Sequence, residues 1–259
     1  MSKTRVFSFH GIGFDPSVFT TKRWIKQANT SFSFDHELRK KNIEHTSVTL
    51  RGDIDPSFLD KGINFEEEAN FVLEKYPDIR QPINNGDKLV FLSHSGGLIL
   101  ALEVCKLLKS KNYATPNLLI LVTPFDATLP SSMRPWKPIT LETEYDEVLE
   151  EVLRFGENDS LKNPEIWNEF KKKIRWHFNG LTRYMLEKPL NLEQVRIYCV
   201  CCANDAVISK NHALAVKNCF SAYKSFECLD LPNAGHNFII NPLVFKQFCD
   251  SILPIISML

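Results

Sequence analysis

The sequence has almost no net charge and no segment suited to a membrane. Lysine plus arginine and aspartate plus glutamate each number 31 in the 259 residues, so no net field favours nucleic acid or an anionic membrane surface as partner. A basic stretch followed by an apolar one is missing at the N-terminus, and no apolar run is long enough to span a bilayer. We therefore expect a cytoplasmic protein with no membrane span and no nucleic-acid partner.

Phosphate-binding glycine loops are also missing, and no two Cys-x-x-Cys motifs occur that could form a pair. The seven cysteines form an odd set whose one Cys-x-x-Cys spacing, Cys199 to Cys202, lies with Cys201 inside an apolar run. This pattern predicts reduced core residues rather than disulfides or zinc ligands. The glycines after the first predicted strand are too few and wrongly spaced for Gly-x-Gly-x-x-Gly or a Walker loop. We expect neither a metal nor a nucleotide cofactor.

What the sequence does contain is an alternation of apolar strands and amphipathic helices. With 44% hydrophobic residues, the chain can bury a large core, and its length suits one α/β domain over residues 1–259. Helical patterns cover 65–76, the segment after residue 97, and 242–256, whereas 19–34 shows only a broken helical pattern. Strand patterns cover 5–9, 44–50, 89–92, 117–122, 195–202 and 226–231. This order predicts a mostly parallel sheet covered by helices on both faces.

Residues 129–190 differ from the rest and predict a helical insertion. Prolines come first, and two helical patterns follow, of which the second has Asn163 as a cap and Pro164 at its first position. Its apolar residues fall on one face: Trp167, Phe170, Ile174, Phe178 and Leu181. Two helices inserted between strands of a sheet would make a lid. We expect His177, close to that face, to be a packed or partly exposed helix histidine.

The segment LVFLSHSGG, residues 89–97, carries the strongest chemical signal. An apolar strand stops at small residues and gives way to a helix, with the Ser95 hydroxyl at the apex. The nucleophile elbow has the pattern Gly-x-Ser-x-Gly, because residues beside the serine must be small enough for the backbone to crowd together. Ser93 replaces the first glycine, so the match is partial.

Further candidates also follow predicted strand ends. Asp205 and His236 come after the last two strands, and the order Ser95, Asp205, His236 is that of the α/β-hydrolases. A serine hydroxyl needs a histidine to accept its proton, and the histidine needs a carboxylate to hold its tautomer. Asp126 is the rival acid, since it also follows a strand end after the serine.

The residues His10-Gly11-Ile12-Gly13, here called the HGIG loop, directly follow the first strand. Glycines at such a place let the backbone turn sharply and present N–H groups to a neighbouring site, as an oxyanion hole requires. The Ile12 amide is the candidate donor. The alternative interpretation is a simple glycine-rich turn without a catalytic role. His10 and His94 are weaker candidates than His236 for the base, because they are committed to the HGIG loop and the elbow.

Over most of its length the chain resembles an α/β-hydrolase, and within that superfamily it is similar to the stand-alone type II thioesterases of polyketide and non-ribosomal peptide synthesis. The resemblance lies in the segments FLSHSGGLILALEVCKLL, LLILVTPFDATLP, CCANDAVI and LPNAGHNFII. It implies Ser95 as nucleophile, Asp205 as acid and His236 as base, with the amides of Ile12 and Gly96 as oxyanion donors. Ser93 and the HGIG loop depart from the family, which usually has glycine at the first position and Ala-Gly-Gly at the second.

Three functions are compatible with these residues. The first is a thioesterase acting on an acyl carrier protein or coenzyme A, without cofactor or metal, and the carrier protein enters as a partner through the resemblance. The second is a carboxylesterase or lipase acting on oxygen esters, which uses the same catalytic groups. The third is a non-catalytic ligand-binding protein of the same fold. Apolar residues on the insertion favour an apolar acyl chain, although they could equally well pack only on the sheet.

Overall fold

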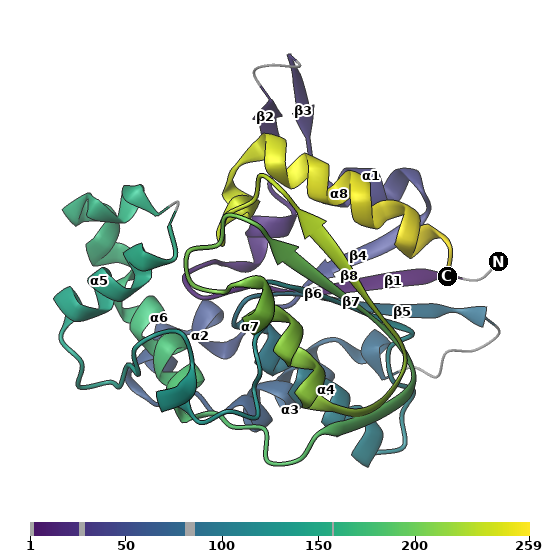
Figure 1. Cartoon of the computed structure of the whole chain (residues 1–259), viewed down its shortest axis with the longest axis horizontal. Helices are drawn as coiled ribbons and strands as arrows, with labels where there is room; N and C mark the ends of the chain where they lie inside the picture. Colours follow the sequence, from purple (N-terminus) through teal and green to yellow (C-terminus); the bar gives the residue numbers. More distant parts are fainter. Residues whose placement is uncertain (1–2, 26–28, 81–85, 157) are drawn as a thin grey trace.

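The computed structural model describes residues 3–25, 29–80, 86–156 and 158–259. Its centre is a six-stranded sheet in the order β4-β1-β5-β6-β7-β8, in which all neighbouring strands run parallel (Figure 1). The strands are β1 (Thr4–Phe9), β4 (Ile43–Ser47), β5 (Lys88–His94), β6 (Leu118–Val122), β7 (Leu190–Cys202) and β8 (Phe220–Leu231). The predicted parallel sheet is confirmed.

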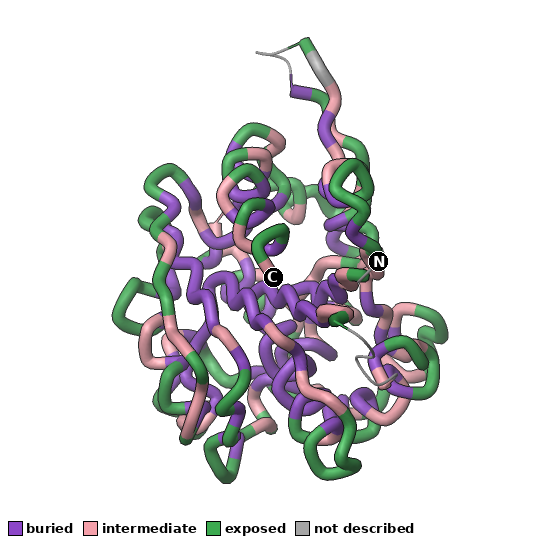
Figure 2. The backbone as a smooth tube through the Cα atoms, turned by 90° about the vertical axis from the view of Figure 1, so that its right-hand side faces the viewer, coloured by how far each residue is buried: buried purple, intermediate pink, exposed green. Residues whose placement is uncertain are grey.

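Helices cover both faces of this sheet and bury two apolar layers. Along β1, Phe7 and Phe9 belong to one buried cluster and Val6 to the other, as alternation along a strand requires. Helices α3 (Phe65–Lys75) and α4 (Gly97–Ser110) pack residues into the first cluster. Helix α8 (Pro242–Ser257) and α1 (Phe34–Lys40) supply the second. Figure 2 shows this buried backbone in the middle of the molecule.

Shorter helices connect the main elements. They include α2 (Arg51–Ile54) after β4 and α7 (Lys210–Leu214) after β7. The 3-10 turns are Pro16–Phe19, Pro56–Asp60, Pro77–Ile79, Ser131–Met133, Asp159–Lys162, Ala215–Cys219 and Phe238–Ile240. Among the described helices, none is long and apolar enough to cross a membrane.

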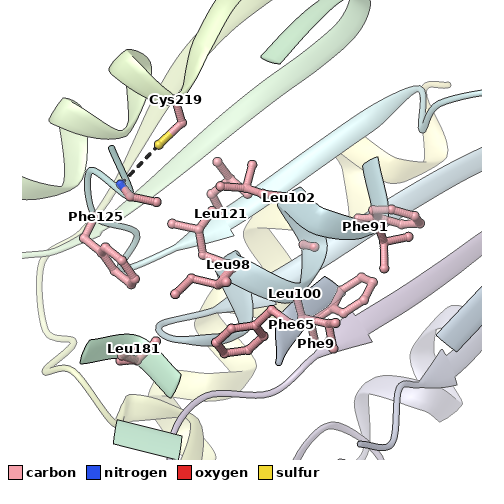
Figure 3. Close-up of a cluster of buried hydrophobic side chains, with 14 of the residues drawn as sticks. Phe9, Phe65, Phe91, Leu98, Leu100, Leu102, Leu121, Phe125, Leu181 and Cys219 are labelled. Carbon is pink, nitrogen blue, oxygen red and sulfur yellow. Dashed lines mark hydrogen bonds between the residues drawn. The ribbon is translucent and has the colours of Figure 1, made fainter. Parts of the chain in front are cut away.

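The segment between β6 and β7 contains α5 (Tyr145–Arg154) and α6 (Pro164–Arg183), which lie to one side of the sheet in Figure 1. The predicted cap is confirmed, because Asn163 Oδ1 accepts a hydrogen bond of 2.9 Å from Glu165 N and Pro164 follows at the first position. Leu181 of α6 joins the cluster that also contains Phe65 and Leu100 (Figure 3). The insertion therefore shares its core with the sheet.

The prediction for residues 19–34 was wrong where a short hairpin forms. Strands β2 (Arg23–Ile25) and β3 (Thr30–Phe32) pair antiparallel, and residues 26–28 lie outside the described part. Ile25 is buried whereas its neighbour Trp24 is 55% exposed, which is the period-two pattern of a strand. The Arg23 guanidinium lies 4.3 Å from the centre of the Phe245 ring and ties the hairpin to α8.

Candidate active site

Ser95 occupies the sharp turn between β5 and α4. Its φ is +50°, a left-handed conformation that L-residues seldom adopt, and its N–H donates a 2.9 Å hydrogen bond to Val122 O on β6. A Cβ at Gly97 would lie 2.4 Å from Phe9 O and 2.6 Å from His10 O. Both contacts are with backbone, so only glycine fits there. The turn thus has the backbone geometry that the elbow pattern predicts.

Ser95, His236 and Asp205 lie in one continuous chain of hydrogen bonds. Ser95 Oγ is 2.8 Å from His236 Nε2, and His236 Nδ1 is 2.7 Å from Asp205 Oδ2. Because an ionised carboxylate can only accept, Nδ1 carries the proton and Nε2 is left to accept from the serine hydroxyl. This arrangement allows transfer of the serine proton to His236.

The Asp205 carboxylate is held ionised behind the imidazole. Its second oxygen accepts hydrogen bonds from the amides of Val207, at 2.9 Å, and Ile208, at 2.7 Å. Burial by itself would raise the pKa of Asp205, but the hydrogen bond and the charge of His236, together with the two amides, lower it below its usual value. The side chain is fully buried, so these contacts operate with little solvent screening.

Asp126, the rival acid, has other partners. Its Oδ1 accepts from the Thr128 amide at 2.9 Å and from the Thr128 hydroxyl at 2.6 Å, and its Oδ2 accepts from Asn218 at 2.7 Å. These bonds occupy the carboxylate within the loop after β6. The structure therefore places Asp205, and not Asp126, against His236.

His94 contacts the backbone of His236, and Phe155 contacts its ring. His94 Nε2 donates a 2.9 Å hydrogen bond to the backbone carbonyl of His236. Burial, and then the nearby His236, lower the pKa of His94 to about 3, so this ring stays neutral. The Phe155 ring of the insertion meets the His236 ring edge-on at 4.7 Å between centres. His94 thus contacts the loop that carries His236 rather than the Ser95 hydroxyl.

The HGIG loop packs directly against the elbow. A Cβ at Gly11 would lie 3.2 Å from Ser95 Cβ, and one at Gly96 would lie 3.1 Å from Ile12 Cγ1. Ile12 also lines the same cavity as Ser95 and His236. The structure therefore brings Ile12 and Gly96, the residues of the two predicted donors, beside Ser95.

Three hollows adjoin this site. One contains Ser95 and is also lined by Val152, Phe155 and Phe178 of the insertion. An outer groove of about 550 Å³ shares Ile12, Val152 and Asn158 with it and leads outward past Phe170 and Ile240. A third hollow, next to Ile12, is lined mainly by the apolar residues Phe9, Val48, Leu50, Phe65, Leu100 and Leu181, together with His10 and His177. Apolar side chains thus surround Ile12 in both inner hollows.

Sequence reasoning missed Asp53 and Lys173, which adjoin the HGIG loop. Lys173 Nζ lies 2.5 Å from Asp53 Oδ1, and Asp53 Oδ2 lies 3.1 Å from His10 Nε2. Nothing in the sequence joins a lysine of the insertion to an aspartate after β4, so no local signal could have found the pair. His177 is buried, as the packed alternative predicted, and it accepts a hydrogen bond from Gly13 N at 3.2 Å.

None of the seven cysteines, all within the described residues, forms a disulfide. Cys228 is exposed, so the expectation of a core position was wrong there, because β8 is an edge strand of the sheet. Cys201, Cys228 and Asp230 form the one group of three potential metal ligands in the described part of the chain. Lys210 Nζ lies 2.7 Å from Asp230 and already balances its charge, which makes this group a poor cation site.

No family model and no curated protein sequence matched the chain. Solved structures did match. RedJ, a thioesterase from the prodiginine pathway of Streptomyces coelicolor, is 17% identical with a TM-score of 0.73, over 97% of this chain and 85% of its own. ClbQ, from the colibactin NRPS/PKS pathway, is 13% identical with a TM-score of 0.73, over 99% of both chains. Human thioesterase 2 is 16% identical with a TM-score of 0.60, over 99% of this chain and 97% of its own.

These likenesses and the sheet topology define the fold. The chain has the α/β-hydrolase fold, and its structural neighbours include RedJ and YbtT, a type II thioesterase from the yersiniabactin NRPS/PKS pathway. The predicted fold class and the resemblance to that group of structures are confirmed. At these levels of identity the likeness establishes the fold, whereas the activity depends on the residues of the site.

Proposed function

We propose that this protein is a serine hydrolase that cleaves acyl thioesters through Ser95, His236 and Asp205. The observation that carries the proposal is the chain of contacts from the Ser95 hydroxyl through the His236 imidazole to the Asp205 carboxylate, at 2.8 and 2.7 Å. Support for a thioester substrate comes from the thioesterases among its structural neighbours and from the apolar hollows beside Ser95. The proposed partner is an acyl carrier protein, in the cytoplasm.

In the first half of the reaction, Ser95 Oγ attacks the thioester carbonyl carbon while its proton moves to His236 Nε2. The carbonyl oxygen becomes an oxyanion and accepts hydrogen bonds from the Ile12 and Gly96 amides. Asp205 stabilises the imidazolium without taking its proton. The tetrahedral species collapses, the C–S bond breaks, and His236 gives its proton to the leaving thiolate, which leaves an acyl ester on Ser95.

In the second half, His236 takes a proton from water, and the resulting hydroxide adds to the acyl ester carbonyl. The same amides hold the second oxyanion. The bond to Ser95 Oγ then breaks, His236 returns its proton to that oxygen, and the free acid leaves. No metal or cofactor takes part in this scheme. Residues 129–190 serve as the lid of a single domain over 1–259, since Phe155 packs edge-on against the imidazole and Phe178 lines the same hollow, where both would keep water away.

Replacing the nucleophile tests this proposal directly. Ser95→Ala should lower turnover by about a million-fold, because the acyl-enzyme cannot form, and it should abolish labelling by a fluorophosphonate probe. Ser93→Ala, two residues earlier at the end of β5, is the matched control and should keep both. The measurement is hydrolysis of acyl-thioesters and p-nitrophenyl esters of graded chain length by both variants and the wild type.

The same assays separate the other two functions. Turnover of oxygen esters alone would favour a carboxylesterase or lipase. A wild-type protein that neither turns over any of these substrates nor reacts with the probe would contradict the proposal and favour a ligand-binding protein of this fold.

A further inference from the structure

Helix α6 of the insertion is linked to both ends of the HGIG loop. At the His10 end the link runs from Lys173 through Asp53 to His10, and at the Gly13 end His177 accepts a hydrogen bond from the Gly13 amide. Between them on the same helix, Ile174 would be 3.2 Å from a Cβ at Gly13. Residues 173, 174 and 177 are spaced so that one helix face presents all of them to the loop.

The His10 end fixes the direction of the proposed Ile12 donor. Gly11 O accepts a hydrogen bond from His10 Nδ1 at 3.1 Å and a longer one from Phe14 N at 3.4 Å. The Gly11 carbonyl and the Ile12 N–H belong to one planar trans peptide and point in opposite directions. Whatever holds Gly11 O therefore aims the Ile12 N–H.

His10 is itself held by the buried carboxylate of Asp53, which in turn contacts Lys173 of the insertion. Asp53 lies between His10 Nε2, at 3.1 Å, and Lys173 Nζ, at 2.5 Å, and it also accepts from Leu50 N at 2.8 Å. Only 2% of the His10 side chain and 3% of the Asp53 side chain are exposed. Burial alone would raise the pKa of Asp53, but His10, Lys173 and His177 together lower it well below its usual value, so the carboxylate stays charged.

The Gly13 end is held by a neutral imidazole. Gly13 has a φ of +74°, and its N–H donates to His177 Nδ1 at 3.2 Å. Burial first, and then the neighbouring His10 and Lys173, keep the pKa of His177 well below its usual value. The ring is therefore neutral, with the lone pair of Nδ1 free to accept.

We propose that Lys173 and His177 are positioning residues that couple the packing of α6 on the HGIG loop to the geometry of the oxyanion hole. Lys173 acts through Asp53 and His10 on the Gly11–Ile12 peptide. His177 acts on Gly13. The inference rests on the proposed function. When α6 is displaced, Asp53 behind His10 loses Lys173 and the Gly13 amide loses its acceptor, so the Ile12 N–H between them is no longer aimed at the oxyanion. Thioester hydrolysis is thereby confined to the state in which the insertion covers the site.

Conservative variants of both residues test the coupling. Lys173→Met removes the ammonium and keeps the length of the side chain. His177→Asn retains an oxygen acceptor where Nδ1 lies, whereas His177→Gln places its polar atoms at the position of Nε2 and loses the contact with Gly13. Lys172→Met is the matched control, because Lys172 lies on the same helix and its ion pair among the described residues is with exposed Asp60, at 3.4 Å.

We expect Lys173→Met and His177→Gln to lower kcat by about 10- to 100-fold with little change in KM, because a misplaced oxyanion donor acts on the transition state. The inhibition constant of a boronic acid, whose tetrahedral adduct with serine mimics the oxyanion, should rise in proportion. His177→Asn and Lys172→Met should stay near the wild type. Thermal melting shows whether each variant is folded at the assay temperature.

Two results would overturn the coupling while leaving the proposed function intact. One is an active wild type whose Lys173→Met and His177→Gln variants keep its kcat and boronate inhibition. The other is an equal loss in His177→Asn and His177→Gln, which would assign the effect to packing. A wild type without turnover or probe labelling would overturn the proposed function and this inference together.

Discussion

Ser93 stands where the elbow pattern has its first glycine, and the structure accommodates its side chain inside the sheet. The residue is 1% exposed, and within the described part of the chain its hydroxyl is buried without a hydrogen-bond partner. A buried, unpaired hydroxyl costs free energy that an apolar group of the same shape does not. Serine in place of glycine at position 93 thus lowers the stability of the fold but leaves the backbone geometry at Ser95 intact.

Ser93→Ala should therefore stabilise the protein. Removing the unpaired hydroxyl should raise the free energy of unfolding by about 1 kcal/mol and the melting temperature by roughly 2–4 °C. Calorimetry measures the change, and kcat should stay at the wild-type value. A destabilised Ser93→Ala variant would mean that the hydroxyl has a partner.

Asp205 and Asp126 are both carboxylates that follow strand ends, but only Asp205 contacts His236. Asp205→Asn should lower kcat by about 10⁴-fold, since an amide no longer stabilises the imidazolium and can enforce the wrong tautomer. Asp126→Asn is the matched control and should keep kcat in its folded fraction. Equal kcat values for the two variants in a thioester assay would remove Asp205 from the proposed role.

Among single residues, the sequence identified those that directly follow a strand end. Ser95, Asp205 and His236 could be picked out because parallel strands bring their carboxyl ends to one edge. Asp53 and Lys173 could not, because their contact with each other and with His10 exists only after the insertion has packed on the sheet.

Among the elements, the buried ones were predicted best. All of Leu118–Val122 is buried, and the continuous apolar run marked β6 almost to the residue. The hairpin of β2 and β3 escaped prediction because its strands are three residues each, too short to show a period. The N-terminal parts of β7 and β8 were missed because exposed polar residues interrupt their apolar pattern.

Helix α5 lines the passage between the outer groove and Ser95, and Val152 belongs to both hollows. Val152→Phe should narrow this passage. We expect KM for long-chain acyl-thioesters to rise about tenfold while short-chain substrates are less affected, because the larger ring takes up space that the acyl chain needs. Leu149→Phe, one turn away on the same helix and outside both hollows, is the control. An unchanged chain-length profile in Val152→Phe would place the acyl chain elsewhere.

The whole molecule carries several histidines that folding keeps neutral. Burial lowers the pKa of His45 to about 4 and that of His94 to about 3. In the unfolded chain each of these rings takes up a proton near pH 6.5, whereas in the folded protein it stays neutral. The stability that depends on neutral rings is therefore fully present above pH 6.5. That advantage is lost as the pH falls from 6.5 towards the folded pKa of each ring.

The free energy of unfolding should thus fall below pH 6.5 by about 1.4 kcal/mol per pH unit for each such histidine. Denaturant unfolding between pH 7 and pH 5 measures the slope. His45→Gln should reduce it by one histidine's share, with His36→Gln, on the exposed side of α1, as the surface control. A slope that His45→Gln leaves unchanged would mean that this ring is protonated in the folded protein.

The hydrogen bond between Ser95 and His236 joins residues that are 141 positions apart in the chain. During synthesis the hydroxyl is therefore made long before the imidazole that would activate it. A nascent or truncated chain has an inert alcohol at position 95, and the proposed attack on an acyl thioester has to wait until the last strand and its loop have joined the sheet.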